Sequence, residues 1–261
     1  MKVHTLFWIS VSSLLVCTMS ASEWKKKCEE EWGLQGAPMP DSVDWRLVYE
    51  ARPLGRNLLK NPSPHGNPLP ESDFDYRTRD GPPPREPQGD FSGWTTSTEK
   101  LPEKKTNIPP GAVVCSSIEN SWFSMEQVVD LKAEGLWDEL LDEFQPAIAI
   151  QDWYKAIQLE EHAFELHVKL LGADKSTVIS EHSVQPTEAP YTESATWKMV
   201  SHMFSSYGPG VRYVHFKHRL KNMFRDGVGA DFFQTLSSDS SVIITPNHPP
   251  VTPTNTSLSL S

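Results

Sequence analysis

Acidic residues and histidines are the side chains of this chain best suited to acid–base or metal chemistry. Glu160, Glu161 and His162 are consecutive, so their side chains diverge and are expected in a solvated loop. His215 and His218 lie on a stretch that alternates as a strand, where an odd separation points two side chains to opposite faces, and no shared metal site is expected. The sequence contains no GxSxG, P-loop, GxGxxG or HExxH motif. We therefore predict a non-enzyme without catalytic residues, metal or cofactor.

The cysteines and the first residues bear on the compartment. Cys17, Cys28 and Cys115 have no paired spacing, which predicts neither a disulfide framework nor a zinc site, although Cys28 and Cys115 could pair if the chain were processed. Residues 1–21 combine a weakly basic start, an apolar run and small residues, as a signal peptide does, but also fit an apolar helix without a targeting role. Asn255 begins a glycosylation sequon that matters only in a secreted chain. The sequence favours a cytoplasmic protein, with a secreted or plasma-membrane protein as the alternative.

Composition excludes some classes of partner. The formal net charge is −10 and the charges are spread along the chain, so no basic face is available for nucleic acid. The apolar run near the start is too short for a clear transmembrane span. With 22 prolines and 38% hydrophobic residues, the chain is expected to combine a core with long irregular stretches, and its 9 tryptophans suit a β-sandwich core.

The longest stretch with clear periodicity runs from Gln127 to Tyr154. It begins with β-forming residues and continues with apolar residues at three- and four-residue spacing, which predicts a strand and then an amphipathic helix. The predicted buried stripe is Ala133, Leu136, Trp137, Leu140, Leu141 and Phe144. Pro146 ends the helix because its ring disfavours helical geometry in the preceding residue, and a buried strand follows. The carboxylates of the other face are expected to be solvated, namely Glu134, Asp138, Glu139, Asp142 and Glu143.

Strands dominate the remaining predicted elements. Phe164 to Leu170 alternates apolar and polar residues, as a half-buried antiparallel strand does. Further strands are predicted at 94–98, 112–115, 178–182, 197–204, 211–218 and 241–245, and helices at 23–32 and 43–49. Many short strands with few helices predict an antiparallel β-sandwich. Residues 61–92, rich in Pro and Gly, predict a loop insertion, and the Ser/Thr/Pro tail 246–261 is expected to be disordered.

Five separate segments, in order along the chain, resemble the F-box-associated (FBA) domain of the glycoprotein-recognising F-box-only proteins. They are RNLLKNP at 56–62, the stretch 127–154, ELHVKLLGAD at 165–174, SHMFSSYGPGVRYVHFKH at 201–218 and DSSV at 239–242. EWKKKCEEEW at 23–32 is similar to the branch of this family named for non-specific cytotoxic cell receptors. The resemblance implies a mainly β protein, a jelly-roll-like antiparallel β-sandwich of about ten strands with short helices. It predicts an FBA domain at 56–245, preceded by a helical remnant or linker at 22–55.

The resemblance also implies a function. The F-box members recognise N-glycan cores on misfolded glycoproteins and deliver them to a Skp1–cullin–F-box ubiquitin ligase for degradation. Here only residues 1–22 precede the resembling part, fewer than an F-box needs, so direct Skp1 docking is not expected. The Tyr-Trp-Lys triplet of the glycan-binding members is absent too. Its loop offers Phe224 to stack and Arg225 to donate, and a second loop offers Asn120.

We therefore expect a non-catalytic module that binds misfolded or glycosylated proteins, with weak glycan binding through Phe224, Arg225 and Asn120. Ubiquitin-ligase components are possible partners. The alternative is a cell-surface or secreted receptor of cytotoxic leukocytes, which the signal-like residues 1–21 would support.

Overall fold

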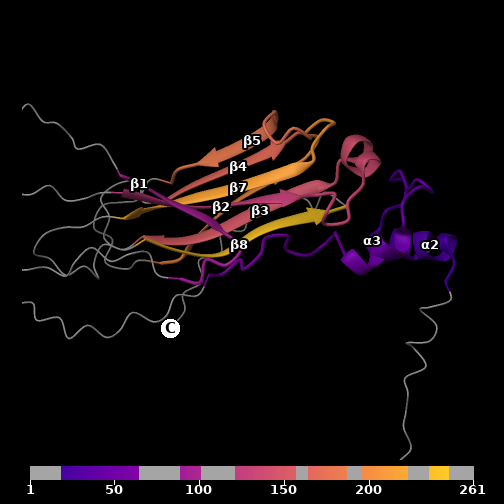
Figure 1. The fold of residues 1–261 in the computed structure, drawn as a ribbon, viewed down its shortest axis with the longest axis horizontal. Coiled ribbons are helices and arrows are strands. Elements are labelled where there is room, and N and C mark those ends of the chain that lie inside the picture. The colour runs from indigo at the N-terminus through magenta and orange to yellow at the C-terminus, as the bar shows by residue number, and fades with distance from the viewer. Residues whose placement is uncertain are drawn as a thin grey trace, which may run out of the picture.

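The computed structural model of the chain describes residues 19–64, 89–100, 121–156, 164–186, 196–222 and 235–246. Short helices come first in this part of the chain and strands follow (Figure 1). The elements are α2 (Ala21–Trp32), α3 (Trp45–Ala51), β1 (Thr95–Lys100), β2 (Ser121–Asp130), the π-helix η2 (Leu140–Phe144), β3 (Ala147–Ala156), β4 (Phe164–Leu171), β5 (Val178–Val184), β6 (Lys198–Phe204), β7 (Tyr213–Asn222) and β8 (Thr235–Thr245).

The strands form two antiparallel sheets. One has five strands in the order β1-β2-β7-β4-β5, and the other has three in the order β6-β3-β8. Figure 1 shows the two sheets as layers, with the helices α2 and α3 at one end. The predicted mainly β antiparallel sandwich with short helices is confirmed. The described residues contain eight of the roughly ten strands that a jelly-roll implies, and the strand predicted at 112–115 lies outside them.

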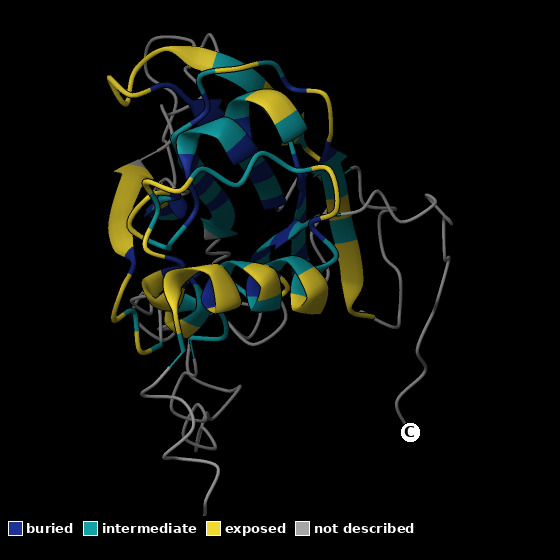
Figure 2. Cartoon of the chain, turned by 90° about the vertical axis from the view of Figure 1, so that its right-hand side faces the viewer, coloured by how far each residue is buried: buried dark blue, intermediate teal, exposed yellow. Residues whose placement is uncertain are grey.

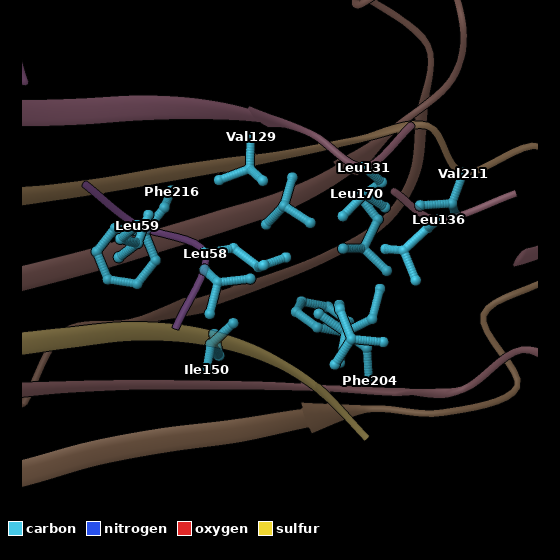
Figure 3. Packing of buried hydrophobic residues seen from close by; sticks show 14 of the residues in the cluster. Leu58, Leu59, Val129, Leu131, Leu136, Ile150, Leu170, Phe204, Val211 and Phe216 are labelled. Carbon is cyan, nitrogen blue, oxygen red and sulfur yellow. The ribbon is translucent and has the colours of Figure 1, made fainter. Parts of the chain in front are cut away.

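The core lies between the sheets because each strand turns alternate residues inward. Along β4, Phe164, Leu166 and Val168 are buried while the residues between them are partly exposed, as the sequence pattern predicts. Figure 3 shows Phe216 from one sheet and Ile150 from the other pointing into this shared core. Each such side chain contributes about 1.5–3 kcal/mol of burial free energy, so the alternation holds the sheets together.

One side of the sandwich is closed by the segment after α3. Leu58 and Leu59 insert between the sheets (Figure 3) and are buried. The backbone N–H of Leu58 donates to the carbonyl of Val242 at 2.8 Å, and the Asn57 side chain accepts from the Val242 N–H at 3.1 Å. On the other sheet, the Gln127 side-chain oxygen accepts from the Lys60 N–H at 3.0 Å, and its Nε2 donates to the Lys60 carbonyl at 2.7 Å. This segment therefore covers the outer edge of β8 and ties it to β2.

The amphipathic helix predicted over 133–144 is confirmed only in its second half, and its first half is wrong. Residues 133–135 lie in a turn and 136–137 have no regular structure, whereas 138–144 are helical and end in η2. The Asp130 carboxylate accepts from the N–H groups of Lys132 and Ala133 at 3.1 and 3.0 Å, which makes a turn instead of a helical start. Gly135 has φ +103, outside helical geometry. The apolar spacing nevertheless identified buried residues correctly at Leu136, Trp137, Leu140 and Leu141, whereas Ala133 is exposed.

Both N-terminal helices are confirmed. In α2 the Ser20 side chain accepts from the Glu23 N–H and the Glu23 carboxylate accepts from the Ser20 N–H, forming a capping box, and Gly33 ends the helix with φ 64. Figure 2 looks onto this end of the molecule and shows the exposed outer side and the buried inner side of α2. The second helix begins two residues later than predicted because the Asp44 carboxylate caps it.

Candidate functional site

Most strand ends next to residues outside the described ranges lie at the end of the sandwich away from the helices. Lys100 is the register partner of Ser121, and Ser121 is also the partner of Asn222. Nearby, Ala156 pairs with Thr235. These strand ends lie at the left of Figure 1, opposite α2 and α3. We name this end of the sandwich the loop end.

The predicted ligand-binding residues Phe224, Arg225 and Asn120 lie outside the described residues, and so do Glu160, Glu161 and His162. The structure does describe the strand ends that are next to the predicted ligand-binding residues. Asn120 directly precedes Ser121, and Phe224 follows Asn222 by two positions. Because Ser121 and Asn222 are register partners on neighbouring strands, the two predicted loops depart from adjacent positions.

An arginine with two carboxylates organises the outer face beside the loop end. Arg219 donates to Glu165 at 3.0 Å and to Glu99 at 2.7 Å, which links β7 to β4 and β1. Its guanidinium lies 4.8 Å from the ring centroid of Trp122, and Lys221 lies 6.0 Å from the same centroid. The two cations cover the Trp122 ring, which is buried. In this arrangement Trp122 stiffens the strand ends and does not present an open stacking surface.

A second chain of hydrogen bonds crosses the same face. The His167 Nδ1 atom lies 3.0 Å from Ser183 Oγ, and its Nε2 atom lies 3.1 Å from Glu165 Oε2. This is the hydrogen-bond order of a Ser–His–acid relay. Glu165, however, also accepts from Arg219 and Gln185, and Ser183 stands on an open sheet face. We assign the chain a structural role that joins neighbouring strands.

The histidines of β7 point to opposite faces, as their spacing predicts. His215 lies on the outer face, 3.2 Å from Glu126 Oε2, whereas His218 is fully buried between the sheets. Within the part of the chain that the structure describes, no three His, Cys, Asp or Glu side chains are grouped to hold a metal ion. Cys28 is a free, buried thiol, and burial raises its pKa to about 11. Cys17 and Cys115 lie outside the described residues.

Sequence reasoning missed a buried polar cluster between the sheets. His218 Nδ1 lies 2.6 Å from Asp152 Oδ2, and the hydroxyls of Ser237 and Ser240 donate to Asp152 Oδ1 at 3.2 and 3.0 Å. The Trp94 ring stacks on the His218 ring at 5.1 Å between centroids. The alternation of β3 carries the signal that could have found it, because Asp152 occupies an inward position in an otherwise apolar series.

Three of the carboxylates expected to be solvated are in fact paired. Asp142 takes a bidentate contact from Arg212, with both N–O distances 2.8 Å, and Arg212 Nε lies 2.9 Å from Asp138. The hydrogen bonds from Arg212 lower the pKa of Asp142. Glu134 forms an ion pair with Arg56. These contacts fix the turn region to the segments that flank it, which the sequence pattern could not show.

The comparisons with known proteins agree on the family. The sequence model of the family described as "F-box associated region" matches residues 49–244. F-box only protein 50 from Danio rerio is 52% identical over 239 residues, covering 88% of this chain and 99% of that protein. F-box only protein 50 from Homo sapiens is 40% identical over 221 residues, covering 82% and 72%.

Solved structures add little to this. TmCBM61, solved in complex with β-1,4-galactotriose, matches with a TM-score of 0.34 and 15% identity, over 73% of this chain and 99% of that one. A likeness this low carries no argument about ligands. Among the described residues, no helix is long and apolar enough to cross a membrane.

Proposed function

The chain belongs to the F-box associated region family, and from this premise we propose that it is a non-catalytic interaction module for misfolded or glycosylated proteins. In this role it recruits them to ubiquitin-dependent degradation, as a relative of the substrate-recognition adaptors of Skp1–cullin–F-box ligases. The family match over 49–244 carries the proposal. It covers both sheets and the loop end.

The geometry supports a binding role at the loop end. The strand ends there are held by the Arg219 ion pairs and by the ladder between β2 and β7. Rigid strand ends that carry long connecting segments are a common way to build binding sites. Glycan affinity is proposed to be weak, because the family's stacking triplet is replaced by a sequence that offers only Phe224 and Arg225.

Degradation of a misfolded glycoprotein tests the function. Its half-life is measured by translation shut-off in cells that contain or lack the chain, with and without an inhibitor of ubiquitin activation. The chain is expected to shorten the half-life, and the inhibitor is expected to abolish the difference. An unchanged half-life contradicts the proposal.

Calorimetric titration with chitobiose tests the glycan part. We expect a dissociation constant for chitobiose above about 1 μM, which corresponds to a binding free energy weaker than about −8 kcal/mol. A micromolar affinity that Phe224→Ala abolishes would contradict this. The receptor alternative stays a prediction, since the described residues do not test it. N-terminal sequencing that begins near Ser22, with Asn255 glycosylated, would favour it.

A further inference from the structure

The two outer faces of the sandwich differ sharply in charge. The outward positions of the five-stranded sheet carry a dense set of ionisable side chains, including Glu99, Glu126, Glu165, Glu181, Lys169, Lys217 and Arg219. On the three-stranded sheet, inward positions are given by buried Ile148, Ile150 and Phe204, and the residues between them face outward. This second face is almost without charge.

Apolar side chains take the place of the charges. Trp153 and Met199 are cross-strand partners on this face, and Lys155 and Leu236 are partners farther along it. Trp197, Met199 and Leu236 are 41%, 43% and 38% exposed, so they are among the most exposed large apolar side chains of the described residues. The outward set is Ala149, Gln151, Trp153, Lys155, Met199, Ser201, Met203, Leu236, Ser238, Ser241 and Ile243, and the exposed Trp197 comes two residues before Met199. We call the outward set the apolar face.

The composition of the apolar face is that of an interaction surface. Aromatic residues and methionine are enriched at the centres of protein interfaces, and charged residues are depleted there. Methionine adapts to varied partners because its side chain is unbranched and flexible. The outer face of the five-stranded sheet is charged, so the fold does not require an apolar outer face. The apolar side chains of the three-stranded sheet are therefore not needed for folding alone.

The apolar face borders a strand edge that the described chain leaves open. In the ladders of the described residues, β6 pairs with β3 alone, and β5 meets it through the stacked rings of His182 and His202 without a ladder. The opposite edge strand, β8, is covered by the segment after α3, which includes the bond from the Gly55 N–H to the carbonyl of Ile244 at 2.9 Å. An open strand edge offers a row of backbone donors and acceptors to another extended chain.

The size of the apolar face decides between possible occupants. The 7 residues of β6 rise about 3.3 Å each, and three strands about 4.8 Å apart give a face of about 23 by 14 Å, or roughly 300 Å². A stable protein–protein interface buries about 800 Å² on each partner. The face is too small for a dimer of this chain by itself, whereas the edge of β6 has the length of one extended segment of about seven residues.

We propose that the edge of β6, which has no second ladder partner among the described residues, and the apolar face together bind an extended, uncharged, apolar stretch of unfolded polypeptide. The segment adds as a strand to β6, and its alternate side chains contact Met199 and Met203. Backbone hydrogen bonds supply affinity for any extended chain, and the apolar face selects apolar side chains. The inference rests on the proposed function and names the feature of a misfolded protein that is bound, although this binding needs neither a glycan nor a ubiquitin ligase.

A fluorescein-labelled peptide of about eight alternating Thr and Val residues, with blocked ends, tests the site by fluorescence anisotropy on the full chain. Saturable binding is expected. A peptide of the same length with Pro at alternate positions is expected not to bind, because Pro lacks the N–H that strand addition requires. Met199→Lys places a charge in the apolar face and is expected to weaken binding at least about tenfold.

Val128→Lys is the matched control, since Val128 is 52% exposed on the charged sheet. It is expected to bind like the wild type, and urea melts check that both variants fold. Equal binding by Met199→Lys and the wild type, or by the Pro peptide, overturns the proposal. So does absent peptide binding together with a dimer that Met199→Lys dissociates in sedimentation, which would assign the face to a second copy. The peptide has no glycan and is not degraded in this assay. A failure to bind it would therefore contradict only the peptide site and would not affect the degradation and chitobiose tests of the proposed function.

Discussion

Asp152 is fully buried, and its two carboxylate oxygens have three side-chain partners. The contact of 2.6 Å between Asp152 Oδ2 and His218 Nδ1 links β3 to β7. Ser237 and Ser240 both reach Asp152 because β8 shifts register opposite this residue, between the partners of Gln151 and Trp153. One carboxylate thereby joins β3, β7 and β8 across the core.

Replacing Asp152 should therefore cost far more than its polarity suggests. Asp152→Ala leaves a buried imidazole and two hydroxyls without their acceptor, and we expect a loss of about 3–5 kcal/mol in the free energy of unfolding. Urea denaturation at neutral pH measures it. Ser201→Ala, at an exposed position of the neighbouring strand, is the control and should change stability by less than about 0.5 kcal/mol. A small loss for Asp152→Ala would mean that the cluster contributes little to holding the sheets together.

At the scale of the elements, the turn region before η2 depends on one glycine. Gly135 has φ +103, and a Cβ on it would lie 2.9 Å from the Cβ of Ala51 in α3. Gly208 also has positive φ, +88, but a Cβ there would meet nothing within 4 Å. An alanine at Gly208 therefore adds only backbone strain, whereas an alanine at Gly135 adds backbone strain and a steric clash.

We expect Gly208→Ala to lower the free energy of unfolding by about 1 kcal/mol through strain alone. Gly135→Ala should cost about 1–3 kcal/mol more, because α3 must move away from the turn region. Thermal or urea unfolding of the two variants measures the difference. Equal losses would show that the contact with Ala51 relaxes freely.

The edge strands β5 and β6 meet through two histidines. The rings of His182 and His202 stack 4.0 Å apart and 2° from parallel. Burial lowers the pKa of both, and the charge of His202 lowers the pKa of His182 further. The neutral forms are thus the ones that suit the folded state.

A lowered pKa in the folded state makes stability depend on pH in a definite direction. The contribution of this pair is complete above the ordinary histidine pKa of about 6.5 and is lost as pH falls through the lower folded values. His202→Phe keeps a stacking ring without a charge, so its stability should fall less than that of the wild type between neutral pH and about pH 5. Urea denaturation across this range gives the difference. Parallel pH profiles would contradict the assignment.

The same elements show what the sequence could and could not predict. Strands such as β4 were predictable because alternation alone decides which side chains are buried. Residues 133–137 were misassigned because their apolar spacing fits a helix, although Gly135 and the Asp130 turn delay the helix until residue 138. The Arg212 pairs with Asp138 and Asp142 join residues about 70 positions apart, which no local pattern contains. The predicted ligand residues Phe224, Arg225 and Asn120 stay predictions.

At the scale of the whole molecule, the N-terminal helices are part of the sandwich and not a separate unit. The family match begins at residue 49, inside α3, yet Trp24, Cys28 and Trp45 belong to the same buried cluster as the residues between the sheets. Trp45 meets Trp137 edge to face at 4.9 Å, and the Trp137 indole donates to the carbonyl of Pro38 at 2.7 Å. The helices thus cover the end of the core opposite the loop end.

This arrangement predicts one cooperative unfolding transition that includes the helices. Trp45→Ala removes a buried ring from the contact with Trp137 and should cost about 3–5 kcal/mol, with helix and sheet signals lost together in circular dichroism and tryptophan fluorescence. Leu47→Ala lies in the same helix at a side chain that is 60% exposed and should change stability by less than about 0.5 kcal/mol. If Trp45→Ala instead melts the helices in a separate early transition and leaves the main one unmoved, the helices are only attached to the sandwich. In that case the folding unit is the part that the family match covers.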